Sequence, residues 1–247
     1  MPALNRIWGR LDEKSVADAS AWTGPYRWLR NSFAGNSARI VGTDNRLNWK
    51  RALLRGTSIR VAGSHNLVEL GEAARLYDVS IDIRGSNCRL SIGDGCILKG
   101  ASIELSEDET CLSLGSRSTV TESRLVVTDR RARIQVGADC MIALHSQIRC
   151  GDGQTIYDMA DGAILNRAEY IEIGDRVWIT ADCQAMRNIR IGSGSIIASG
   201  SVIAEDVPEN VVAGGIPARV IKTGISWRRE NIARLPPGWF SRAPHRG

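Results

Sequence analysis

Aliphatic residues recur every six positions in the last third of this 247-residue chain, and this spacing restricts its possible folds more than any other feature. The series is Ile173, Ile179, Ala185, Ile191, Ile197 and Ile203. A second series, small or aliphatic, follows four residues later: Val177, Cys183, Ile189, Ser195, Ser201 and Val207. An α-helix needs apolar residues every three to four positions, and a simple alternating strand would not place Gly and Ser at regular intervals. A short strand and a tight turn in each hexad explain both series, so three hexads should close one triangular coil.

Upstream, the period is longer than three hexads. Two series have the same longer step: Leu70, Ile92, Leu114, Val136, and Ile59, Ile81, Ile103, Leu125. We interpret this period as the same coil carrying a short polar loop at one corner. The next step, from Val136 to Ile173, is longer again by about 15 positions, so the fourth corner loop should be that much longer than the others. Function usually lies in a long loop on a rigid scaffold.

The sequence therefore predicts an all-β solenoid, a parallel β-helix, in three parts. Residues 1–58 form an irregular or helical N-terminal cap, since the open end of a solenoid exposes strand edges. Residues 59–215 form the β-helix, with the long loop at 150–170. Residues 216–247 form a basic, partly helical tail.

Composition agrees with a thin aliphatic core, because aromatic residues make up only 5% of the chain. The six cysteines have no CxxC spacing, so we expect free thiols, mostly in the core. No segment has the length and apolarity of a signal peptide or a membrane span, which favours a cytoplasmic protein.

Charge is distributed unevenly along the chain. Residues 1–60 hold 11 Lys/Arg against 4 Asp/Glu, and residues 216–247 hold 7 against 1, whereas residues 61–215 hold 14 against 22. Basic ends could attract phosphates of a cofactor, a lipid-linked substrate or an inner membrane, or be plain solvated flanks. A strand–Gly-loop–helix signature is absent, which argues against a sugar-nucleotide pyrophosphorylase. No nucleic-acid partner is expected.

The run from IGDRVWIT to GGIPARVIK resembles the C-terminal coils of hexapeptide-repeat acyltransferases, especially bacterial capsule and cell-surface polysaccharide O-acetyltransferases. The match is specific from Ile171 to Lys222 and weaker, though in register, from Ile59. This resemblance implies a left-handed β-helix, a homotrimer, and acetyl-CoA bound between neighbouring β-helices. It also implies a saccharide acceptor and no metal cofactor.

The resemblance also implies roles for individual residues. The acceptor would contact the long loop through Asp152, Tyr157, Asp158 and Asn166. Trp178 would shape the acetyl and acceptor pocket, or else pack at a subunit contact. The acyl donor would lie along Ala198, Ser199 and Gly200, with its nucleotide end at Pro217, Arg219 and Lys222. Guanidinium and ammonium groups suit phosphates, although an ordinary basic turn explains Arg219 and Lys222 equally well.

One position departs from the family. The family loop usually reads Asp-Gly-His or Asp-Ser-His, and its histidine deprotonates the acceptor hydroxyl, whereas this chain has Gln154. An amide cannot take a proton near neutral pH, and a positioned base contributes roughly 10²–10⁴-fold in rate. Gln154 could be an engineered change, mark a weak or inactive homologue, or only orient the acceptor, or His145 could substitute. By the repeat, His145 should be equivalent to Ala101, Ser123 and Asp182 and point outward.

Two other functions remain open, and a third is disfavoured. A zinc carbonic anhydrase of this fold needs three converging histidines, and the spacing of His65 and His145 does not provide them. A catalytically inactive scaffold or saccharide-binding homologue would have kept the fold and lost the base. Amino-sugar N-acetylation needs less help from a base. For either transfer we expect a direct reaction, because no Ser or Cys lies in a nucleophile motif beside a base.

Overall fold

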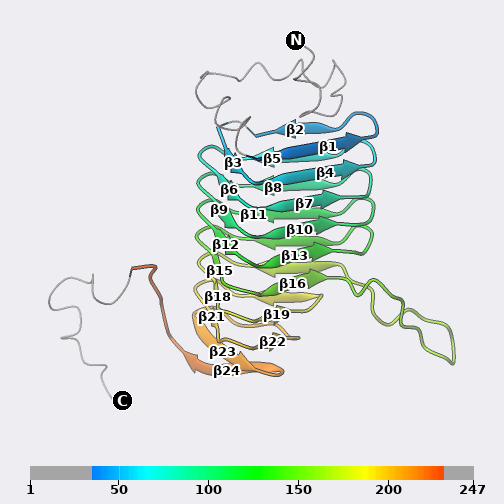
Figure 1. Ribbon diagram of the computed structural model, residues 1–247. Helices are drawn as coiled ribbons and strands as arrows, with labels where there is room; N and C mark the ends of the chain where they lie inside the picture. The colour runs from blue at the N-terminus through cyan, green and yellow to red at the C-terminus, as the bar shows by residue number, and fades with distance from the viewer. Residues whose placement is uncertain (1–34, 50, 231–247) are drawn as a thin grey trace, which may run out of the picture.

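The computed structural model describes residues 35–49 and 51–230, and the described residues form a parallel β-helix with strands and turns but no α-helix (Figure 1). The first sheet has the order β1 (Ser37–Val41), β4 (Ser58–Ala62), β7 (Ser80–Ile83), β10 (Ser102–Leu105), β13 (Arg124–Val127), β16 (Gln147–Cys150), β19 (Gln184–Ala185), β22 (Val202–Ile203). The second has the order β2 (Arg46–Asn48), β5 (Leu67–Leu70), β8 (Arg89–Ile92), β11 (Cys111–Leu114), β14 (Arg133–Val136), β17 (Tyr170–Ile173), β20 (Ile189–Ile191). The third has the order β3 (Leu53–Arg55), β6 (Arg75–Tyr77), β9 (Ile97–Lys99), β12 (Thr119–Thr121), β15 (Met141–Ile142), β18 (Trp178–Ile179), β21 (Ile196–Ile197), β23 (Val211–Gly215), β24 (Ala218–Thr223).

Pairing between coils follows the periods found in the sequence. Ile81 pairs with Ile59 on one side and with Ile103 on the other. Val136 pairs with Ile173, so the longest step spans one coil and the long loop. The prediction of a stacked solenoid with a long fourth corner is therefore confirmed.

The core is a continuous stack of inward aliphatic side chains and thiols. Both hexad series are buried, from Ile173 and Val177 to Ile203 and Val207. Burying one such aliphatic side chain stabilises the fold by roughly 1.5–3 kcal/mol. All six cysteines are free and five are buried, as predicted, while Cys111 is partly exposed.

Glycines between the second and third sheets allow the coils to approach closely. A Cβ at Gly115 would lie 2.4 Å from the carbonyl carbon of Gly137 in the next coil. A Cβ at Gly137 would lie 2.4 Å from the Oδ1 of Asp175, and that same carboxylate accepts the Ala138 N–H at 2.7 Å. Corner side chains therefore join one coil to the next.

The solenoid begins earlier in the chain than the period indicated. Strands β1 and β2 lie inside the segment 1–58, where Ser37 pairs with Ser58 of β4 and Arg46 pairs with Leu67 of β5. This coil is one residue shorter than the next, in which Ser58 pairs with Ser80. The longer period misses the first coil for that reason. The predicted cap over 1–34 lies outside the described residues.

The C-terminal tail also differs from the prediction. Residues 218–223 form β24, which pairs antiparallel with β23 at the end of the third sheet. Its backbone groups complete hydrogen bonding that the last parallel strand would otherwise leave open. The prediction of a partly helical tail is wrong for its described part, which ends at 230.

Replacing one inward residue should show that the aliphatic stack provides the stability. Ile134 is fully buried between paired coils, so Ile134→Ala should lower the free energy of unfolding by roughly 2–5 kcal/mol through lost burial and a cavity. Ile216 is 76% exposed, and Ile216→Ala should change that free energy by less than about 0.5 kcal/mol. Denaturant unfolding of both variants measures the difference, and equal losses would contradict it.

Candidate functional site

The long fourth corner is an arm, residues 151–169, that projects from the solenoid between β16 and β17 (Figure 1). Its two halves run antiparallel. Tyr157 bridges to Ile164, and the Ile156 carbonyl accepts the Leu165 N–H at 2.8 Å. The arm is thus an ordered hairpin on the rigid coils.

Two of the predicted acceptor residues hold the base of the arm together. The Asn166 amide donates to the Asp152 Oδ2 and to the Gln154 carbonyl, both at 2.8 Å, and its Oδ1 accepts the Ile156 N–H at 2.8 Å. Asp152 also forms an ion pair with Arg187, in which the Asp152 Oδ2 lies 2.8 Å from the Arg187 Nη1. Asn166 is only 5% exposed, so the amide that links these groups lies out of the solvent. Arg187 was missed in the sequence because it lies in the next coil, far from Asp152 along the chain.

The other arm candidates lie further out. Gln154 is exposed, and the bond that fixes it uses its backbone carbonyl. Tyr157 is 62% exposed. The Asp158 carboxylate accepts the Ala160 N–H at 2.7 Å, so it helps form the turn at the tip of the arm. The structure thus joins Asp152 and Asn166 directly and presents Gln154 and Tyr157 to the surroundings.

Trp178 lies on β18 of the third sheet, whereas the arm connects the first and second sheets. Its indole packs against Trp227, with ring centroids 5.8 Å apart and planes tilted by 46°. The Trp178 Nε1 is buried and has no hydrogen-bond partner among the described residues. The resemblance implied a pocket or a subunit contact for Trp178, and nothing in the sequence indicated that Trp227 is its neighbour.

Small residues flank Trp178 along the same sheet. The Thr180 N–H bonds the Ile197 carbonyl, and the Ala198 N–H bonds the Ala213 carbonyl, which aligns the outward positions of Thr180, Ala198 and Gly214 in one column. The Ser199 hydroxyl donates to Thr180 Oγ1 at 3.0 Å, and Gly200 turns the corner with φ +73°. Thr180 lies two positions after Trp178, so this column of small residues runs beside the column that contains Trp178.

The predicted phosphate-binding residues lie on the terminal hairpin. Pro217 is in the turn between β23 and β24. Arg219 is exposed and pairs with Glu205 at 2.9 Å, which partly neutralises its charge. Lys222 is exposed on β24, opposite Val212. Gly214 of the small-residue column belongs to β23, so the column and the terminal hairpin are continuous.

His145 is an exposed corner residue between two carboxylates. Its ring nitrogens lie 3.5 Å from Glu122 and 3.5 Å from Asp182, on the preceding and following coils. The outward orientation is as predicted, but the register was wrong by one residue: His145 aligns with Gly100 and Glu122, not with Ala101 and Ser123. The corner before β16 contains one residue more than the corner before β13, which displaces the register.

The buried thiols are poor nucleophiles. Burial raises the pKa of the Cys140 thiol to about 11 and that of the Cys150 thiol to about 12. Since the thiolate is the attacking form, these groups stay protonated and inert at neutral pH.

Within residues 35–49 and 51–230, no group of three or more His, Cys, Asp or Glu side chains could hold a metal ion. The same part of the chain has no helix of the length and apolarity needed to cross a membrane.

Removing the Asn166 amide should loosen the arm without unfolding the solenoid. Asn166→Ala removes three hydrogen bonds that join the two halves of the arm at its base, each worth about 0.5–1.5 kcal/mol. Limited proteolysis should therefore cleave within 151–169 faster than in the unmodified chain. Asp161→Ala, which removes one bond near the tip of the arm, is the control and should have a smaller effect. Equal cleavage rates would contradict the role of Asn166.

Known proteins share the repeat and the fold. A family model for the bacterial transferase hexapeptide (six repeats) matches residues 170–205. A polysialic acid O-acetyltransferase of Escherichia coli O1:K1 / APEC is 32% identical over 119 residues, which is 48% of this chain and 38% of that protein. A polysialic acid O-acetyltransferase of Neisseria meningitidis is 27% identical over 139 residues, which is 56% of this chain and 64% of that protein. The chain thus matches less than two thirds of the length of each relative.

Solved structures extend the likeness over most of the chain. The polysialic acid O-acetyltransferase OatWY superposes with a TM-score of 0.75 at 23% identity, covering 83% of this chain and 97% of that one. The polySia-specific acetyltransferase NeuO superposes with a TM-score of 0.55 at 26% identity, covering 81% and 92%. The first likeness establishes the fold, a left-handed β-helix. The repeat match over residues 170–205 and the relatives show that the chain is similar to hexapeptide-repeat acetyltransferases.

Proposed function

We propose that this chain is an acetyl-CoA-dependent O-acetyltransferase that acts on a saccharide. The observation that carries the proposal is the ordered arm, which places position 154 at the surface of a hexapeptide scaffold whose next coil carries Trp178. Relatives with the same repeat are named as O-acetyltransferases.

Direct transfer fits the residues present. The acceptor oxygen attacks the thioester carbonyl, a C–O bond forms, the C–S bond breaks, and the acceptor proton ends on the leaving CoA sulfur. A backbone N–H along the column of Thr180 and Ala198 would polarise the carbonyl. Protonated, buried thiols such as Cys140 and Cys150 support a route without an acyl-enzyme.

A homotrimer would complete the site. Within one chain the arm leaves between the first and second sheets, while Trp178 faces outward from the third. An arm that reaches a neighbouring chain could bring an acceptor to that chain's third sheet. The exposed apolar residues of the arm support such a contact: Ile156, Tyr157, Met159, Ile164 and Leu165.

For the acceptor we propose a cell-surface polysaccharide or its precursor, which the names of the two curated relatives and the basic segment 216–247, with 7 Lys/Arg against 1 Asp/Glu, support. A polymer bearing carboxylates would be attracted to a basic protein. We propose a cytoplasmic location, where acetyl-CoA is made, and a peripheral position at the inner membrane if the acceptor is lipid-linked.

Gln154 favours a second candidate, a saccharide-binding homologue without catalytic activity. The amide can donate to and accept from a hydroxyl, so it could hold an acceptor, but it cannot take its proton near neutral pH. The two candidates share the arm and differ in whether CoA is released.

Restoring an imidazole distinguishes them. Gln154→His should raise the rate of CoA release from acetyl-CoA, with a polysaccharide acceptor present, by roughly 10²–10⁴-fold. Gln184→His, which places a histidine at another exposed glutamine, is the matched control and should not change the rate. If neither the unmodified chain nor Gln154→His releases CoA with any saccharide acceptor, the enzyme proposal fails.

The molar mass of the protein in solution tests the proposed trimer. Light scattering should give three times the 26.9 kDa of one chain. Ile156→Ser combined with Ile164→Ser should shift the protein toward monomer, because both side chains are about half exposed in one chain and would be buried in the assembly. Val41→Ser, at a similarly exposed position on β1, should leave the trimer intact. A monomeric unmodified chain would rule out the two-chain site.

A further inference from the structure

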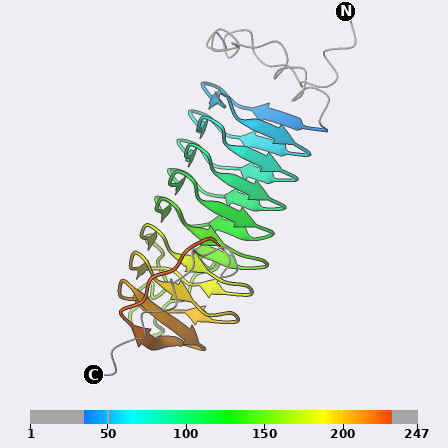
Figure 2. The ribbon, with the colours of Figure 1, turned by 90° about the vertical axis from the view of Figure 1, so that its left-hand side faces the viewer.

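Residues 225–230, here called the strap, follow β24 and run back along the third sheet toward earlier coils (Figure 2). The Ile225 N–H bonds the Asn210 carbonyl at 3.0 Å, where the strap begins. The strap then passes Trp178 and ends near Thr119 and Cys140. It therefore crosses the face on which Trp178 lies.

Trp227 fixes the middle of the strap. It is only 8% exposed, although it lies outside the repeat. Its Nε1 donates to the Arg176 carbonyl at 2.7 Å, and the Arg176 guanidinium donates to the Trp227 carbonyl at 3.0 Å. This reciprocal pair ties the strap to the corner just before Trp178.

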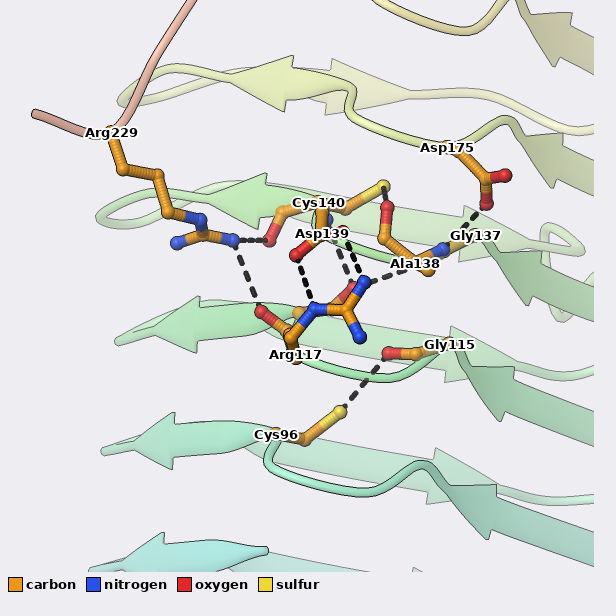
Figure 3. Close-up of polar contacts among 10 residues, drawn as sticks. Cys96, Gly115, Arg117, Gly137, Ala138, Asp139, Cys140, Asp175 and Arg229 are labelled. Atoms are coloured by element: carbon orange, nitrogen blue, oxygen red, sulfur yellow. Dashed lines mark hydrogen bonds and ion pairs between the residues drawn. The ribbon is translucent and has the colours of Figure 1, made fainter.

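Arg229 fixes the far part of the strap (Figure 3). Its guanidinium donates to the Cys140 carbonyl at 2.7 Å, to the Arg117 carbonyl at 3.2 Å and to Thr119 Oγ1 at 3.1 Å. The corner beneath is itself braced by the ion pair of Arg117 and Asp139, whose atoms approach to 2.6 Å. Side-chain donors to backbone carbonyls on two coils hold the strap in one place.

The strap covers Trp178 but leaves its polar group unused. A buried indole N–H usually finds an acceptor, yet the Trp178 Nε1 has none among the described residues, while the Trp227 Nε1 is satisfied. The same indole borders the small-residue column of Thr180 and Ala198. A buried donor without an acceptor would gain one from an oxygen of a ligand bound against this face.

We propose that the strap is a wall of the transfer site and that Trp227 is a positioning residue for Trp178. The inference rests on the proposed function, and it adds a residue that the arm and the repeat do not identify. Trp227 holds the Trp178 indole at one angle, so that its N–H faces the acyl donor or the acceptor. Without that packing the indole would rotate, and its donor would lose alignment with the reacting groups.

The test compares kcat and the KM for acetyl-CoA in three variants, using the unmodified chain and, in parallel, the Gln154→His chain. Trp227→Ala should lower kcat by on the order of 10²-fold, the effect typical of a small misplacement, with a smaller change in KM. Trp227→Phe keeps a ring on Trp178 and should recover most of the activity. Tyr77→Ala, which removes an aromatic residue from the same sheet at β6, should leave both constants unchanged.

A spectroscopic signature reports the packing separately from activity. Two indoles with centroids 5.8 Å apart couple and give a couplet in far-ultraviolet circular dichroism. The couplet should disappear in Trp227→Ala and in Trp178→Phe, while both proteins remain folded at the assay temperature. Loss of the couplet with an unchanged kcat would overturn the positioning role. The strap would then contribute to stability alone.

Failure of the proposed function gives a different result. If neither the unmodified chain nor Gln154→His binds or consumes acetyl-CoA, the enzyme proposal and the inference built on it both fall. If the reference chains transfer acetyl groups and Trp227→Ala does so with the same kcat, only the role of Trp227 is overturned. If Trp227→Ala is unfolded at the assay temperature, Trp227→Leu, which keeps apolar bulk but removes the ring, decides: an unchanged kcat in that variant also overturns the role.

Discussion

Backbone hydrogen bonding between stacked coils is the constraint on which the rest of the structure depends. Each strand pairs with the strands above and below it, so successive coils must superpose residue on residue, and every column of side chains must keep one character. Ile59, Ile81 and Ile103 repeat for this reason. The corner glycines have the same origin, because a Cβ at Gly115 would meet the backbone of Gly137. Aliphatic and glycine repeats are two results of one stacking distance.

This redundancy explains why so much of the fold could be predicted from the sequence. The arm was located because an insertion interrupts the count while Val136 and Ile173 keep their character. The predictions failed where the count changed by one residue without a change of composition. A coil one residue shorter than its successors hid the start of the solenoid, and one extra residue at a polar corner displaced the predicted register of His145. Such shifts leave every inward column intact, so no hydrophobic signal marks them.

The candidate site was less predictable, because its contacts cross between repeating and non-repeating parts of the chain. Asp152 and Asn166 could be assigned to the arm, but their bond to each other and the ion pair with Arg187 depend on how the arm folds back on the next coil. Trp227 is harder still. It reaches Trp178 only because β24 reverses the chain direction and sends the strap back along the sheet. No period relates the two indoles, so a tryptophan in a basic tail could equally have been solvated.

The backbone of Gln154 helps to hold the arm, whereas its side chain would take part in the chemistry. The arm is fixed through the Asn166 amide, the Asp152 carboxylate and the backbone carbonyl of Gln154, and that carbonyl is the same whatever side chain follows it. Exchanging an amide for an imidazole at this exposed position therefore leaves the geometry of the arm intact and alters only the ability to accept a proton near neutral pH. Stability and activity are thus governed by different atoms of the same loop. A fully folded protein is compatible with either a transferase or a binding protein, and in the function proposed above the side chain at position 154 decides between them.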